Sequence, residues 1–194
     1  EKPLELAKPF VKKVEDLVGK RLGDAKNPLL WKIVVSPNLA ISNYPTLHNF
    51  GLAKDTVTGF ASWVGDNFAS HEVLFLVRGM LAVEARIAEL ESKAKDFERL
   101  QAAQKALAKV LESDKAPKAA SVLMDEYASL MPADFFKDAA SQFDLALRRV
   151  SRLIEIDEQD AGDTAILVQP MVYGNYGKGS ASGAFYTRDI VSGE

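Results

Sequence analysis

Cysteine is absent from this 194-residue sequence, and histidine occurs only twice. Without cysteine the chain can form no disulfide, and it offers neither thiolate metal ligands nor a catalytic thiol. His48 and His71 have no second histidine, Asp or Glu at the i+4 spacing of a helical metal pair. A G-x-S-x-G nucleophile elbow is missing as well. The sequence therefore predicts no metal ligands and no catalytic residues.

Surplus positive charge and long apolar runs are also lacking. Lys and Arg total 24 against 27 Asp and Glu, a net charge of -3, which argues against a nucleic-acid-binding surface. The longest apolar run, 73–77, is far shorter than the roughly 20 residues that span a bilayer. We expect an intracellular protein without a membrane span. An organelle (chloroplast or mitochondrion) after removal of a targeting peptide is a compatible location.

The elements that the sequence does contain are typical of an α+β domain, and the length suits a single one. The expected helices, in chain order, cover 5–18, 54–63, 71–111 with an interruption near Ser92, 118–131 and 133–153. The expected strands cover 29–36, 163–174 and 180–188. Segment 37–51, rich in proline and asparagine, is predicted as a loop.

These elements indicate a helix-rich middle flanked by a short N-terminal strand and a C-terminal β-hairpin. We divide the chain into a helix, strand and loop over 1–53, a helical region over 54–156 and the hairpin over 157–194. No internal repeat interrupts this order. The sequence therefore predicts one domain over 1–194.

The turn of the hairpin is rich in glycine. Its glycines, at 174, 177, 179 and 183, permit positive φ angles and let backbone N–H groups approach an anion. The turn is not a Walker A loop or a G-x-G-x-x-G motif, because neither spacing occurs and no helix follows. On spacing alone, a plain hairpin is favoured over a phosphate-binding turn.

The residues around this turn resemble those of a known family. LVQPMVYGNYGKGSASGAFYTRDIVSGE (167–194) is similar to the stretch of pyruvate, phosphate dikinases in which V-Q-x-M-V-F-G-N leads through a glycine-rich turn into S/T-G-V-A-F-T-R. FVKKVEDLVGKRLGDAKNPLL (10–30) resembles their G-K-x-F-G-D-x-x-N-P-L-L, and HNFGLAKDTVTGFA (48–61) resembles their N-L-G-L-N-D-x-T-V-x-G-L-A. GDTAILVQ (162–169) resembles G-T-A-V-N-V-Q. The resemblance is collinear, dense at both ends and weak over 90–150.

The resemblance implies part of the N-terminal nucleotide-binding domain of these enzymes, which is of ATP-grasp type and phosphorylates a histidine on a separate domain. By resemblance, Gln169, Met171 and Val172 would line the adenine pocket. Ser180, Ser182 and Gly183 would face the phosphates.

Departures from the family pattern fall at charged positions. The family has V-S-V-R-S-G after N-P-L-L, with an arginine that contacts phosphate, whereas this chain has Val34 or Val35 there. A Tyr-Arg-Arg in a later helix is replaced by the apolar VLFLV (73–77). The family's glycine-rich lobe with its lysine, and its metal-binding acidic residues, are not found in this sequence. Phosphoryl transfer depends on such charges.

We therefore expect a non-catalytic dikinase-like domain without a cofactor. It would act as a structural or accessory subunit through protein–protein contacts in a larger complex. One alternative is the ATP-binding domain, or a fragment, of an active dikinase, a phosphotransferase that uses ATP and Mg²⁺. A second alternative is a helical adaptor in which the hairpin is structural and binds no nucleotide.

Overall fold

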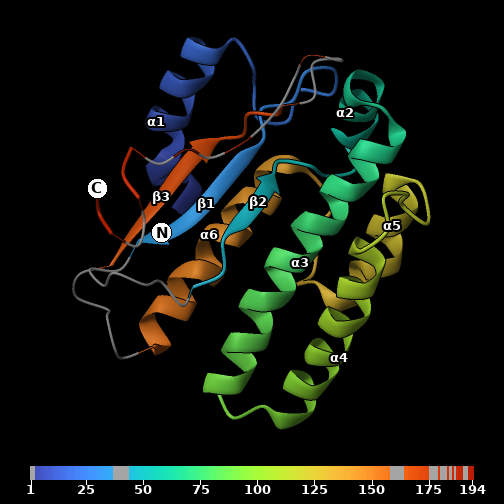
Figure 1. Cartoon of the computed structure of the whole chain (residues 1–194), viewed down its shortest axis with the longest axis vertical. Helices are drawn as coiled ribbons and strands as arrows, with labels where there is room; N and C mark the ends of the chain where they lie inside the picture. The colour runs from blue at the N-terminus through green and yellow to red at the C-terminus, as the bar shows by residue number, and fades with distance from the viewer. Residues whose placement is uncertain are drawn as a thin grey trace.

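The fold combines helices with a three-stranded antiparallel sheet, so the predicted α+β class is confirmed (Figure 1). It is seen in a computed structural model that describes residues 3–36, 44–157, 164–174, 179, 183, 185, 187–189 and 192–194. The helices are α1 (Pro3–Val18), α2 (Val57–Val64), α3 (Asp66–Leu90), α4 (Ala94–Leu111), α5 (Ala120–Tyr127), the 3₁₀ turn η1 (Ala128–Leu130) and α6 (Ala139–Ile156). The strands are β1 (Trp31–Ser36), β2 (Leu47–Phe50) and β3 (Ala165–Pro170).

The sheet has the order β2-β1-β3, so strands distant in the sequence lie side by side. β1 and β3 pair without a break, from Trp31 opposite Pro170 to Ser36 opposite Ala165. Strand β2 lies inside the segment predicted as a loop, so that part of the prediction is wrong. It pairs with β1 through an irregular register, because Asn49 has a φ of 65° and interrupts the extended backbone.

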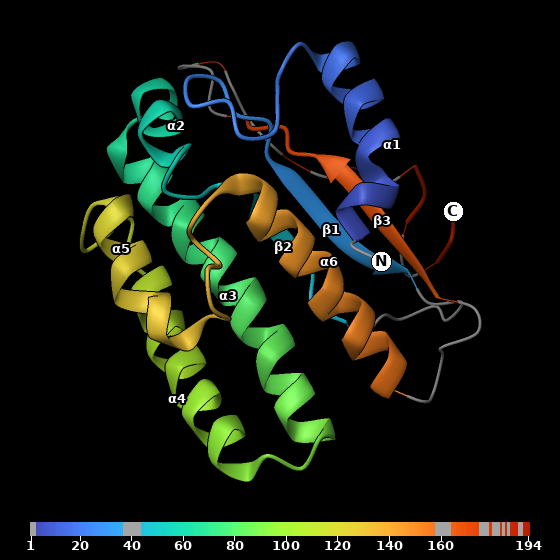
Figure 2. The ribbon, with the colours of Figure 1, turned by 180° about the vertical axis from the view of Figure 1, so that it is seen from behind.

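One face of the sheet carries the core. The β-branched and aromatic residues of β1 alternate, so that Trp31, Ile33 and Val35 all point to this face and are buried. Helix α6 packs there, with the Phe143 ring 5.7 Å from that of Trp31. Figure 2, from behind, shows α6 lying along the sheet and α1 beside it. The backbone N–H of Leu4 in α1 donates to Asp144 of α6 at 3.0 Å.

A long helical hairpin stands beside β2. Helix α3 is buried along much of its length and packs on β2, α4, α5 and α6. It ends before Ser92, whose φ of 58° breaks the helix. This confirms the predicted interruption of the helical region 71–111. Helix α4 then returns along α3, as Figure 1 shows, and buries Leu100 and Leu107.

Two predicted elements differ from the structure or fall outside it. The helix predicted over 133–153 begins only at Ala139, because Asp138 accepts a hydrogen bond from the Ser141 N–H at 2.8 Å and caps it. The predicted second strand of the hairpin, 180–188, falls mostly outside the described residues. A strand within the predicted 163–174 is confirmed as β3, which pairs with β1, whereas the predicted hairpin pairing with 180–188 stays a prediction.

Candidate functional site

The second face of the sheet lies away from α6 and presents a mixed polar and apolar surface. Strand alternation places Lys32 and Val34 of β1 on this face, and the register places Gln169 beside Lys32 and Leu167 beside Val34. Leu167 is 48 % exposed and Gln169 is exposed, whereas their neighbour Val168 on the other face is partly covered by the core. We call Lys32, Val34, Leu167 and Gln169 the open face. In Figure 1 the sheet lies in front of α6, so this face is turned towards the viewer.

Three basic residues lie on neighbouring elements at or beside this face. Lys32 comes from β1, His48 from β2, and Arg78 from α3, which runs alongside β2. Burial lowers the pKa of His48, and the positive charges of Lys32 and Arg78 lower that pKa further. His48 is therefore within electrostatic reach of both cations, although the three residues belong to three different elements.

Lys32 and Arg78 form no ion pair with any carboxylate among the residues that the structure describes. This separates Arg78 from most arginines of the described ranges. Those in ion pairs are Arg21, Arg86, Arg99, Arg148, Arg149 and Arg152. The open face thus offers positive charge that the described part of the protein does not itself neutralise.

A hydrogen-bonded network fastens the segment after β3 beside this face. The Tyr173 hydroxyl donates to Asn49 Oδ1 at 2.6 Å, and Asn49 Nδ2 donates to Glu72 Oε2 at 2.5 Å. Burial raises the pKa of Glu72, although the Asn49 hydrogen bond opposes this, and burial also raises the pKa of Tyr173. The Tyr173 ring packs against Phe60 and Phe68. The network fixes where the residues between β3 and Gly174 lie.

The residues proposed for the adenine pocket lie on or next to the end of β3. Gln169 belongs to the open face, and the Met171 N–H donates to the Leu30 carbonyl at 2.8 Å, which continues the pairing with β1. Val172 is 86 % exposed. Their proposed contacts with adenine stay a prediction.

Only one of the three residues proposed for phosphate contacts is among the described residues. Gly183 is exposed, with open space around its Cα. Ser180 and Ser182 lie outside the described residues. The structure therefore does not test whether these three residues gather at one site. Lys32, His48 and Arg78 were not singled out from the sequence as anion-binding residues.

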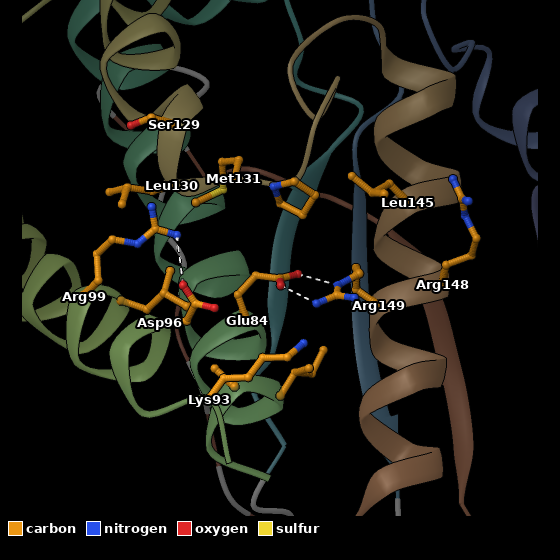
Figure 3. A pocket seen from close by; sticks show the side chains of 14 residues that line it. Glu84, Lys93, Asp96, Arg99, Ser129, Leu130, Met131, Leu145, Arg148 and Arg149 are labelled. Carbon is orange, nitrogen blue, oxygen red and sulfur yellow. Dashed lines mark hydrogen bonds and ion pairs between the residues drawn. The ribbon is translucent and has the colours of Figure 1, made fainter. Parts of the chain in front are cut away.

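A separate cavity of about 530 Å³ lies in the helical part, between α3, α4, η1 and α6 (Figure 3). Its charged side chains are in ion pairs, either with one another or, for Lys93 and Arg148, with Glu91 and Asp144 outside the lining. Arg149 donates from Nε to Glu84 at 2.6 Å and also from Nη2, and Arg99 lies 3.8 Å from Asp96. Because these charges are already paired, the cavity is a weaker candidate for an anionic ligand than the open face.

The second histidine has a structural role. Both ring nitrogens of His71 lie 2.9 Å from backbone carbonyl oxygens, those of Asn67 and Ser113. It thereby links the start of α3 to the end of α4. No cluster of three or more metal-ligating side chains occurs within the described ranges.

The sequence is similar to curated proteins over nearly its whole length. It is 47 % identical to a pyruvate, phosphate dikinase of Treponema pallidum over 186 residues, which are 96 % of the chain. The chain is homologous to one region of pyruvate, phosphate dikinases. Weaker similarity extends to the pyruvate, phosphate dikinase of Entamoeba histolytica, at 26 % identity, and to pyruvate, phosphate dikinase 2 of Zea mays, at 27 %.

The homologous region is a small part of these dikinases. The chain spans 21 % of the Treponema enzyme, 23 % of the Entamoeba enzyme and 22 % of the maize enzyme. No family model matches the chain. Among the helices of the described ranges, none has the length and hydropathy needed to cross a membrane.

Proposed function

We propose that this chain forms one wall of the nucleotide site of a dikinase-type phosphotransferase, and that the open face is that wall. The observation that carries the proposal is the asymmetry of the sheet. One face is buried by helices, while the other presents Gln169. By the family resemblance, Gln169 is the first residue of the segment expected to line the adenine pocket. ATP-grasp-type sites hold the nucleotide between two lobes, so a sheet with one face partly exposed at its described residues suits one lobe of such a site.

The wall has the chemical character that a nucleotide needs. Val34 and Leu167 are apolar neighbours in the register and offer a surface for a base or a ribose. Lys32 and Gln169 lie beside them with an ammonium and a carboxamide. An apolar surface with a few polar groups at its margin is typical of small-molecule sites.

Calorimetric titration of the 194-residue chain with Mg-ATP tests this function. We expect saturable binding that is weakened at least about tenfold by Leu167→Trp, because the indole fills the open face. Leu6→Trp is the matched control, since Leu6 is also an exposed leucine, at 63 %, but lies on α1. Absence of binding, or equal loss in both variants, would contradict the proposal.

A second candidate function is the non-catalytic accessory role, which a different surface favours. Leu6, Phe10 and Leu17 recur at helical spacing along α1 and are 63 %, 73 % and 77 % exposed. An exposed apolar stripe of this kind suits a protein contact. The family pattern has a phosphate-binding arginine where this chain has Val34 or Val35, and this replacement is compatible with lost chemistry.

This second candidate predicts a stable complex in place of nucleotide binding. An assembly isolated through a tag on the chain would dissociate when Phe10→Asp is introduced, and the purified chain would not bind Mg-ATP. Lys13→Asp, on the same helix, controls for the added charge. Sedimentation of the isolated assembly measures the difference. An assembly that is unaffected by Phe10→Asp would argue against a contact through α1.

A further inference from the structure

We propose that Lys32 and Arg78, together with His48, form an anion site on the open face that binds the polyphosphate of a nucleotide. The assignment of the anion to a nucleotide rests on the proposed function above. The site would supply the positive charge that Val34 cannot. Its three residues come from β1, β2 and α3, and none of them occupies the arginine position of the family pattern.

Lys32 is placed to act for the missing side chain. It lies two residues before Val34 on β1 and on the same face, so the two Cα atoms are roughly 7 Å apart along the strand. A lysine stem of four methylene groups can bridge most of that distance, and its ammonium is a compact donor for phosphate oxygens. Charge can therefore reach the space beside Val34 without an arginine there.

Arg78 approaches from the edge of the sheet that β2 forms. It lies on α3, which packs along β2, and its guanidinium carbon lies 5.9 Å from the centre of the Phe75 ring. A guanidinium presents its donors in a planar fork that matches two oxygens of a phosphate group. Its lack of an ion pair in the described structure leaves that fork available.

The electrostatic situation of the three groups favours a bound anion. The pKa of His48 is lowered first by burial and then by the charges of Lys32 and Arg78, so both cations lie within electrostatic reach of this ring. Glu112 lines the same surface pocket as Arg78 but forms no ion pair with it among the residues that the structure describes. Because its pKa is lowered, His48 takes part as a neutral imidazole whose ring N–H can donate to a phosphate oxygen, and the positive charge of the site comes from Lys32 and Arg78.

The test compares three ligands on the 194-residue chain: inorganic tripolyphosphate, Mg-ATP and adenosine. Tripolyphosphate isolates the anion, and adenosine isolates the base and the sugar. We expect Lys32→Ala and Arg78→Ala each to weaken tripolyphosphate binding by about fivefold to tenfold. The double variant should weaken it further, and adenosine binding should be unchanged. Lys105→Ala, an exposed lysine on α4 without an ion pair in the described structure, is the control.

A rescue variant separates charge from other effects of the substitutions. Val34→Arg places an arginine on the open face, at whichever of the two possible family positions, 34 and 35, does not point into the core. In the Lys32→Ala background it should recover tripolyphosphate binding to within about threefold of the wild type. Thermal unfolding of each variant shows whether it is folded. Failure of rescue in a folded variant would show that Lys32 does not supply the charge expected beside Val34, and would overturn that part of the site.

The outcomes distinguish this inference from the proposed function. Binding of Mg-ATP that is insensitive to both Lys32→Ala and Arg78→Ala would overturn the anion site and leave the proposed function standing. Sensitive binding of tripolyphosphate without binding of Mg-ATP would support the anion site and overturn the nucleotide function. Absence of binding by tripolyphosphate and by Mg-ATP would overturn both.

Discussion

The two faces of the small sheet have opposite roles, although they are built from the same residues in alternation. On one face Ile33 is 1 % exposed, paired with Val168 and covered by the helical core. On the other face the next residue, Val34, is partly exposed and pairs with Leu167, which is 48 % exposed. Strand periodicity therefore lets one short segment specify the fold on one side and leave a ligand-accessible surface on the other.

The strongest test of this comparison uses adjacent residues. Ile33→Ala removes a buried side chain and should lower the free energy of unfolding by about 2–5 kcal/mol. Val34→Ala removes a similar side chain from the open face and should cost less than about 1 kcal/mol. Urea unfolding of both variants measures the difference. Equal losses would show that Val34 is covered in solution and would break the comparison.

The second-largest effect is expected from a pair of buried hydrogen bonds that joins α6 to the segment after β2. Gln142 of α6 accepts a hydrogen bond from the Gly51 N–H at 2.8 Å and donates to the Leu52 carbonyl at 3.0 Å. Gln142→Leu leaves both backbone groups buried and unpaired, so we expect a loss of about 2–4 kcal/mol in unfolding free energy. Gln104→Leu, on the partly exposed side of α4, is the matched control and should change little. A small loss at Gln142 would mean that water enters behind the sheet.

The elements with strong local signals could be predicted from the sequence. The β-rich run around Ile33 and the long apolar pattern of α3 each agree with the structure. Strand β2 was missed because it is only four residues long and contains Asn49 at positive φ, so its pairing depends on contacts with β1. The start of α6 was misplaced because Pro132 suggested an earlier helix start, while Asp138 provides the actual cap.

The candidate site was harder to predict because it depends on register and packing. The family resemblance directed attention to positions 34 and 35, at one of which the arginine of the family pattern is missing. The sequence alone does not show that Lys32 faces the same side as Val34 next to Gln169 of a distant strand. Nor does it show that Arg78 of α3 approaches β2. Both arrangements depend on contacts between segments that are distant in the sequence, and no sequence motif encodes such contacts.

An intermediate effect is expected for the hydrogen-bonded network of Tyr173, Asn49 and Glu72 at the margin of the sheet. We call these three residues the rim. Tyr173→Phe keeps the ring against Phe60 and removes the hydroxyl that donates to Asn49, a fully buried residue. We expect a loss of about 1–2 kcal/mol in unfolding free energy, because Asn49 Oδ1 is left without this donor. Tyr127→Phe, a partly buried tyrosine on α5, is the control. The family pattern has phenylalanine at the position of Tyr173, so an unchanged stability would show that the hydroxyl adds nothing to this chain.

The smallest effect concerns the pH dependence of the same rim. Because burial raises the pKa of Glu72, the folded state keeps a proton that the unfolded state has already lost. The free energy of unfolding should therefore fall as the pH rises from the unfolded pKa of Glu72 to its higher folded pKa, and this loss persists above that window. Glu72→Gln removes the loss and can still accept the Asn49 hydrogen bond, so the variant should gain stability relative to the wild type as the pH rises from 4 to 7. Denaturant unfolding across this range, with the exposed Glu98→Gln as control, measures the gain. Parallel pH curves for the Glu72 variant and the wild type would show that Glu72 titrates as an exposed carboxylate, and that the rim is as open as the face beside it.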